Sequence, residues 1–106
     1  MRERDIEACL IREAEKAGGR AYKFTSPGTA GVPDRLVLLP GGIAMFVELK
    51  APGQKPRPLQ ELRGKEIAGL GVPAFWLDSK EEAKDIIAKA LDGKVDIGWR
   101  KWKHHS

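Results

Sequence analysis

The sequence predicts a single α/β domain with the element order α-β-β-β-α-β-α and a mixed central sheet flanked by helices. Apolar residues recur at helical spacing in three segments, residues 3–17, 58–70 and 79–92. Short apolar runs bounded by Gly and Pro separate these segments and are typical of strands. With 106 residues, the chain is long enough for one hydrophobic core and too short for two.

The composition is that of a soluble globular protein, with 42% hydrophobic and 32% charged residues. The N-terminus is charged, and no apolar run approaches the roughly 18 residues that a membrane span needs. We therefore expect a cytoplasmic protein without a membrane partner. The single cysteine, Cys9, excludes an internal disulfide and a multi-cysteine zinc site, and its helical position predicts a small buried side chain.

The first helix is predicted over residues 3–17, where Ile6 and Leu10 belong to the apolar stripe and two glycines end the pattern. Residues 20–25 alternate polar and apolar side chains, as an edge strand does. The loop at residues 26–31 is too rich in Gly and Pro to be regular.

A β-hairpin is predicted from the apolar runs at residues 36–39 and 43–47, because only Pro40, Gly41 and Gly42 separate them. The apolar runs are uninterrupted, which predicts strands covered on both faces.

A basic, proline-rich connection follows at residues 51–58, and a helix begins near Pro58. The stripe of this helix that we expect to face the core consists of Leu59, Leu62, Ile67 and Leu70. Residues 72–77 form a fourth strand. Ser79, with Glu82 three residues later, is a capping box that opens the last helix.

We assign residues 1–92 to the folded domain and residues 93–106 to a basic, Trp-containing tail. The tail alternates aromatic and basic groups from Trp99 onward. Two interpretations stay open: the tryptophans stack on nucleic acid, or they fold back on the body of the domain. His104 and His105 are left out of any metal argument because they can belong to a purification tag.

Acidic residues lie at the ends of the two predicted hairpin strands. Asp34 precedes the first strand, and Glu48 follows the second, 14 positions later. In an antiparallel hairpin the start of one strand lies beside the end of the other, so we expect the two carboxylates to converge. Lys50 shares a face with Glu48 because side chains alternate along a strand. Carboxylate oxygens, with the backbone carbonyl of Leu49, suit Mg²⁺ or Mn²⁺.

A surface ion pair among Asp34, Glu48 and Lys50 is the alternative interpretation. It leaves two adjacent carboxylates with only one lysine, which favours a bound cation. The nearest competing acidic-x-Lys triplet runs from Asp78 to Lys80, but no Pro-Asp pair precedes its strand. The residues alone therefore predict a metal-dependent phosphodiesterase, in which Lys50 orients or deprotonates the attacking water and stabilises the transition state.

The net charge of +4 is compatible with a polyanionic partner. Between residues 50 and 65 only Glu61 is acidic, and five side chains are basic: Lys50, Lys55, Arg57, Arg63 and Lys65. A phosphate backbone would lie along this segment.

This combination of residues resembles the PD-(D/E)xK nuclease superfamily. Residues 31–34 (Gly-Val-Pro-Asp), the Glu-Leu-Lys triplet at residues 48–50, and Gln60 look more specifically like the VRR-NUC domain in its stand-alone phage or bacterial form. The resemblance covers about residues 3–92. It implies a restriction-endonuclease-like core and Mg²⁺- or Mn²⁺-dependent cleavage of DNA, often at branched structures such as four-way junctions, leaving 3′-hydroxyl and 5′-phosphate ends.

Carried over to this chain, the resemblance makes Asp34 and Glu48 metal ligands and Lys50 the catalytic lysine. Gln60 would position the water or the lysine, and Glu7 would be a further metal ligand from the first helix. The alternatives are a glutamate that interacts with the helix dipole at position 7 and an ordinary polar residue at a helix start at position 60.

In the same frame, Lys55, Arg57 and Arg63 would hold the DNA backbone, and the loop at residues 26–31 would approach it closely. Two symmetric cuts at a four-way junction predict a twofold homodimer. No small-molecule cofactor is expected. The location would be the cytoplasm of a bacterium or of a phage-infected cell.

Three functions stay open at this point. The first is a structure-selective DNA endonuclease, and the second is a non-catalytic nucleic-acid-binding module with the same fold. The third is a small protein-interaction subunit, for which the tryptophans of the tail are the only indication. The sequence contains no clear recognition helix, so we expect selection of DNA shape rather than of base sequence.

Overall fold

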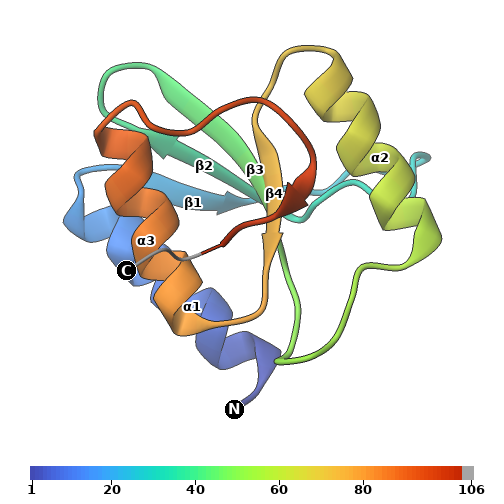
Figure 1. Ribbon diagram of the computed structural model, residues 1–106, viewed down its shortest axis with the longest axis horizontal. Coiled ribbons are helices and arrows are strands. Elements are labelled where there is room, and N and C mark those ends of the chain that lie inside the picture. Colours follow the sequence, from blue (N-terminus) through green and yellow to red (C-terminus); the bar gives the residue numbers. More distant parts are fainter. Residues whose placement is uncertain (104–106) are drawn as a thin grey trace.

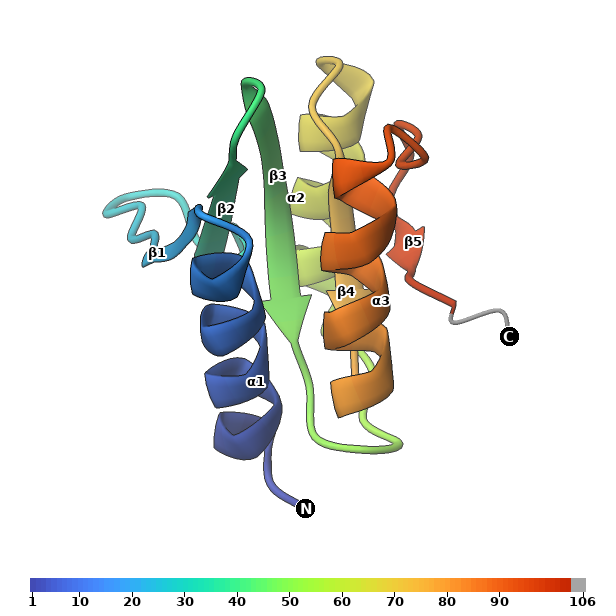
Figure 2. The same cartoon turned by 90° about the vertical axis from the view of Figure 1, so that its left-hand side faces the viewer.

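The computed structural model describes residues 1–103. Its elements, in chain order, are α1 (Glu3–Lys16), β1 (Arg20–Lys23), β2 (Arg35–Leu39), β3 (Ile43–Leu49), α2 (Pro58–Gly69), β4 (Ala74–Leu77), α3 (Lys80–Leu91) and β5 (Arg100–Lys101). Figure 1 shows the sheet in the centre of the molecule, and Figure 2 shows α1 and α3 on one face of the sheet and α2 on the other. The predicted α/β class and element order are confirmed, with a short fifth strand added.

The five strands lie in the order β1-β2-β3-β4-β5. The neighbouring pairs β1–β2 and β2–β3 are antiparallel, as the predicted hairpin requires. The connection through α2 makes β4 parallel to β3, and β5 is parallel to β4. The sheet is therefore mixed, and β3 lies at its centre.

The hydrophobic core lies between the sheet and the α1–α3 pair. The strands contribute every second residue, which explains why Val37, Met45 and Val47 are fully buried. The helices contribute their apolar stripes, with Ile6 of α1 and Ile86 of α3 fully buried. Cys9 also lies in this core, as predicted.

The prediction that the leucines of α2 face the core is wrong. Leu62 and Leu70 are 53% and 81% exposed, whereas the buried residues of α2 are Gln60 and Gly64. The helix turns its polar and glycine-containing side toward the body of the protein, because that side carries the hydrogen bonds of Gln60 and the close packing of Trp99. The spacing of the leucines predicts the helix but not the face that it buries.

The prediction that both faces of the hairpin strands are covered is also wrong in part. Because α2 packs against β4, it leaves the far end of the sheet open. Tyr22 of β1 and Leu38 of β2 are consequently exposed.

The segment after α3 folds back onto the domain. Trp102 is buried, its ring packs edge-on against Phe75 at a centroid distance of 5.1 Å, and its Nε1–H donates to Asp85 Oδ2 at 2.8 Å. The tryptophans of this segment thus pack on the protein, which is the second of the two interpretations of the tail. His104 and His105 lie outside the described residues. Across residues 1–103, no helix has both the length and the apolar character needed to cross a membrane.

We predict that Trp102→Ala lowers the free energy of unfolding by about 3–5 kcal/mol, because the change removes a buried aromatic side chain and leaves Asp85 without this donor. Urea denaturation followed by circular dichroism measures the loss. Ile97→Ala is the matched control, because Ile97 lies in the same segment but is exposed. A loss for Trp102→Ala as small as that of the control would contradict a structural role of this segment.

Candidate active site

The end of the β2–β3 hairpin brings Asp34 beside Glu48. Arg35 is paired with Val47, so the next residues along the ladder, Asp34 and Glu48, lie opposite each other. The backbone of Asp34 is fixed from the other side as well, because its carbonyl accepts a hydrogen bond from Phe24 N–H at 2.8 Å. The strand β3 extends through Glu48, so this carboxylate lies within the sheet.

Glu48 is a buried carboxylate with little charge compensation. Gln60 Nε2 donates to its Oε2 at 3.2 Å, and Lys50 Nζ lies 3.7 Å from the same oxygen. Burial, followed by the negative charge of Asp34, raises the pKa of Glu48 to about 7, although Lys50 acts in the opposite direction. The site therefore favours the addition of positive charge, either as a proton or as a cation.

Gln60 is oriented by two hydrogen bonds, one with the N-cap of α2 and one with Glu48 of β3. Its Oε1 accepts from the backbone N–H of Arg57 at 2.8 Å, which leaves its Nε2–H₂ group free to donate to Glu48. Pro58 occupies the first position of the helix, where no backbone N–H is needed. The amide thus caps the helix and fixes the carboxylate at the same time.

Lys50 and Leu49 are held by the continuation of the β3–β4 ladder. Lys50 N–H donates to the carbonyl of Leu77 at 2.9 Å, which sets the lysine directly after the strand. The side chain of Leu49 is buried in the core, so only its backbone carbonyl is available as the predicted metal ligand.

The structure places Glu7 in an ion pair rather than beside Asp34 and Glu48. Glu7 Oε2 lies 3.1 Å from Arg35 Nε, and Arg35 also donates to the carbonyl of Ala21 at 3.1 Å. The ion pair joins α1 to β2, so it gives Glu7 a structural role in holding the helix on the sheet.

Glu3, one turn before Glu7, is an acidic residue of α1 whose charge also reaches Glu48. Its charge contributes to raising the pKa of Glu48. Sequence reasoning missed it, although the four-residue spacing from Glu7 puts both residues on one side of the helix.

The residues present fit a divalent cation. Within residues 1–103, no three His, Cys, Asp or Glu side chains gather closely enough to hold a metal by themselves. Mg²⁺ typically takes one or two carboxylates and keeps several waters, which matches the pair of Asp34 and Glu48. The pKa of Glu48 is raised first by burial and then by the negative charge of Asp34, so a cation between the two carboxylates would relieve their repulsion.

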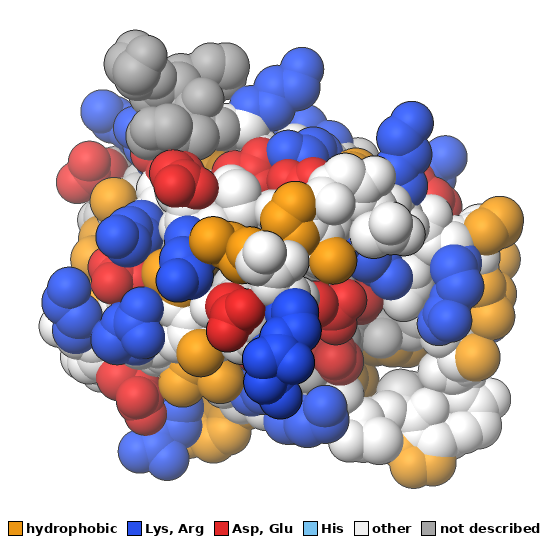
Figure 3. Space-filling view, turned by 90° about the horizontal axis from the view of Figure 1, so that it is seen from below, with side chains coloured by type: hydrophobic (Ala, Val, Ile, Leu, Met, Phe, Trp, Pro, Cys, Tyr) orange, Lys and Arg blue, Asp and Glu red, His pale blue; other side chains and the backbone are white. Residues whose placement is uncertain are grey.

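The predicted DNA-contacting residues fall into two groups. Lys55 and Arg57 are exposed in the connection before α2. Arg63, in contrast, donates through Nε to the carbonyl of Ala30 at 3.0 Å and so ties α2 to the loop at residues 26–31. In the view from below, acidic side chains near the centre of the face have Lys and Arg side chains on several sides (Figure 3).

Gly31, in the same loop, is required by packing. Its φ of +89° is a conformation that favours glycine, and a Cβ there would lie 2.7 Å from the carbonyl oxygen of Leu59. The Gly-Val-Pro-Asp motif therefore begins with a close contact between the loop and α2.

The mixed sheet, the flanking helices and the acidic pair followed by lysine define the restriction-endonuclease-like class of α/β proteins. The chain is 52% identical to "Putative nuclease p44" of Acyrthosiphon pisum secondary endosymbiont phage 1 over 81 residues, which is 76% of this chain and 87% of that protein. A solved VRR_NUC domain superposes with a TM-score of 0.71 at 28% identity, covering 85% of this chain and 94% of the solved chain. No family model matches the sequence. These two similarities show that the chain belongs to the VRR-NUC nuclease family.

We predict that Glu48 makes the protein less stable as the pH rises toward neutrality. The folded chain binds this proton more tightly than the unfolded chain, because the pKa is about 7 against an ordinary value of 4.5. The free energy of unfolding should therefore fall between these two pH values, by up to about 3 kcal/mol in the absence of divalent ions.

Urea denaturation across this pH range measures the dependence. Glu48→Gln should remove most of the slope, since its amide does not titrate. The exposed Glu81→Gln is the control and should keep the wild-type slope. Parallel slopes for Glu48→Gln and wild type would show that Glu48 titrates normally.

Proposed function

We propose that this protein is a divalent-metal-dependent endonuclease that cleaves DNA at branched structures such as four-way junctions. The observation that carries the proposal is the geometry of Glu48, which is buried beside Asp34, fixed by Gln60 and near Lys50. The relative called a nuclease supports the chemistry. Lys23 Nζ lies 3.9 Å from Asp34 Oδ2 and pairs with that acid, whereas Lys50 at 3.7 Å compensates Glu48 only in part, since the pKa of Glu48 stays raised.

Asp34 and Glu48 would hold Mg²⁺ or Mn²⁺, with the Leu49 carbonyl as a further oxygen. When bound, such an ion offsets the negative charge of the phosphate and favours ionisation of water near neutral pH. Glu48 would have to be deprotonated to hold the ion, and its pKa of about 7 means that protons compete with the ion near neutral pH. Affinity for the metal should therefore increase as the pH rises through this value.

Lys50 and Gln60 would orient the reaction. Lys50 follows the last residue of β3 with its ammonium group 3.7 Å from Glu48, so it would lie within reach of a phosphate drawn to an ion held by the acids. There it holds the attacking water or stabilises the charge that develops on the phosphoryl oxygens. Gln60 keeps Glu48 in one orientation without neutralising its charge. Water attacks phosphorus, the P–O3′ bond breaks, and the products carry 3′-hydroxyl and 5′-phosphate ends.

The basic segment before α2 would hold the DNA backbone. Lys55 and Arg57 are exposed there, next to Gln60 at the site. Contacts of this kind read phosphate rather than bases, which supports selection by DNA shape. The protein would act in the cytoplasm of a bacterium or of a phage-infected cell.

We predict that the wild-type protein cleaves a four-way junction in the presence of Mg²⁺ or Mn²⁺, and that EDTA abolishes the activity. Asp34→Ala, Glu48→Gln and Lys50→Ala should each lower the single-turnover rate by at least about 100-fold, because each removes a group from the reacting centre. The assay uses labelled junctions, flaps, duplexes and single strands.

Lys84→Ala is the matched control, because Lys84 belongs to an equivalent acidic-x-Lys triplet on α3 and is exposed. Equal cleavage by wild type, Asp34→Ala and Lys50→Ala would reject the assignment. Salt-dependent binding with no cleavage under any metal would instead favour a non-catalytic binding module.

We propose further that two copies act together, because a four-way junction has two symmetric strands to cut. The exposed leucines Leu62 and Leu70 give α2 an apolar outer surface that a second copy would bury. Apolar side chains are visible at the right-hand edge of Figure 3, on the α2 side.

We predict a solution mass of twice the 11.7 kDa of the chain, measured by sedimentation equilibrium. Leu70→Glu should shift the protein toward the monomer, because it places a charge on the apolar surface. Leu38→Glu, on the exposed part of β2, is the control. A wild-type protein that stays monomeric at all concentrations would rule out this arrangement.

A further inference from the structure

The two residues that flank the proposed reacting centre, Lys50 and Gln60, are joined by a short irregular segment and the first turn of α2. Most of the residues between them are exposed. Residues 51–57 form neither helix nor strand, so their backbone depends on contacts from elsewhere. Two residues that follow α3 support this part of the chain: Lys101, which acts through Asp78, and Trp99, which contacts the start of α2.

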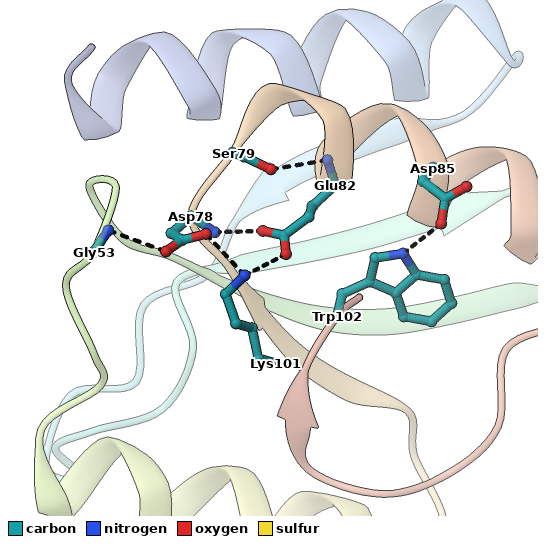
Figure 4. Close-up of polar contacts among 7 residues, drawn as sticks. All are labelled: Gly53, Asp78, Ser79, Glu82, Asp85, Lys101 and Trp102. Atoms are coloured by element: carbon teal, nitrogen blue, oxygen red, sulfur yellow. Dashed lines mark hydrogen bonds and ion pairs between the residues drawn. The ribbon is translucent and has the colours of Figure 1, made fainter. Parts of the chain in front are cut away.

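The first contact runs through Asp78 to the loop after Lys50. The backbone N–H of Gly53 donates to Asp78 Oδ2 at 3.1 Å, and Lys101 Nζ lies 3.0 Å from Asp78 Oδ1. Figure 4 shows that Lys101 of β5 also reaches Glu82, whose other oxygen accepts from Asp78 N–H at 2.9 Å. Lys101 thus compensates both carboxylates, of which Asp78 holds the loop and Glu82 holds the backbone of Asp78.

The second contact runs through Trp99 to α2. Trp99 Nε1–H donates to Glu61 Oε2 at 2.9 Å, and Glu61 directly follows Gln60. The indole ring also lies against the backbone of Gly64, where an added Cβ would come within 2.1 Å of the ring. Only glycine at this position allows the ring to lie so close to the helix.

We propose that residues 99–101 form a C-terminal clamp that positions the reacting centre from both ends. Lys101 holds the loop after Lys50 through Asp78, and Trp99 holds the start of α2, with Gln60, through Glu61. Both are positioning residues, since neither contacts Asp34, Glu48 or Lys50. The inference rests on the proposed function for its effect on catalysis, whereas the contacts themselves are testable without it.

The first experiment measures the loop by NMR without any metal or DNA. In Lys101→Met, the Gly53 amide should exchange with solvent about tenfold faster than in wild type, because its acceptor loses a charge-assisted partner. Lys94→Met is the control, since it removes one positive charge from the connection between α3 and β5. If Lys101→Met does not fold, Asp78→Asn tests the same contact. Gly53 exchange equal to that of the control would overturn the first half of the clamp.

The second experiment measures α2. Glu61→Ala should shift the side-chain amide signals of Gln60, and Glu61→Gln, which keeps an oxygen acceptor for Trp99, should restore them. Unchanged Gln60 signals in Glu61→Ala would overturn the second half.

Single-turnover cleavage at saturating DNA, well below the unfolding temperature, then connects the clamp to catalysis. Lys101→Met and Glu61→Ala should slow cleavage about tenfold with unchanged DNA affinity, and Glu61→Gln should recover the rate. A purely stabilising role would leave these rates at the wild-type value. A wild-type protein that cleaves no DNA would reject the proposed function, while the two NMR experiments would still test the contacts.

Discussion

The site depends on the register between β2 and β3. The pairing of Arg35 with Val47 sets Asp34 opposite Glu48 on the face of the sheet where α2 supplies Gln60. A slip of one residue would turn every side chain of one strand to the other face, which would send Glu48 into the core and Val47 out of it. The burial of Val47 and Met45 therefore fixes the register and, with it, the position of the two carboxylates. Packing on one face of the sheet thus places the candidate active-site residues on the other face.

This dependence explains why so much of the fold and of the acidic pair could be predicted from the sequence. The turn between the hairpin strands is short, and strand residues alternate with period two, so local rules specify both the pairing and the shared face of Glu48 and Lys50. Ile6 and Cys9 are buried as their helical spacing indicates. These features involve neighbours in the sequence, or strands joined by a tight turn.

The features that could not be predicted depend on contacts between distant segments. The leucines of α2 predict an apolar face in contact with the core, yet Gly64 faces inward because Trp99, 35 positions later, packs there. The two-residue strand β5 is too short to show a periodic pattern. The ion pair between Glu7 and Arg35 joins α1 to β2, and helical spacing within α1 does not reveal it. The periodicity of apolar residues predicts that a helix or strand exists, but the segments that pack against it determine which of its faces is buried.

Asp34 and Glu48 lie near Lys50, and Asp78 and Glu82 lie near Lys101, but the electrostatics of the two groups differ. Burial acts to raise the pKa of Asp78, but hydrogen bonds from Lys101 and from Gly53 N–H hold it below its ordinary value, so this pair gains nothing from a metal. At Glu48 the balance is reversed, because burial and Asp34 outweigh a lysine 3.7 Å away. The neutral amide of Gln60 fixes Glu48 without supplying the missing charge, whereas a lysine or arginine in its place would complete an ion pair and remove the attraction for a cation. Incomplete compensation at a rigidly held carboxylate is therefore what distinguishes the candidate active site; the acidic-x-Lys spacing does not, because Asp78 has it too and finds its partner in Lys101 instead.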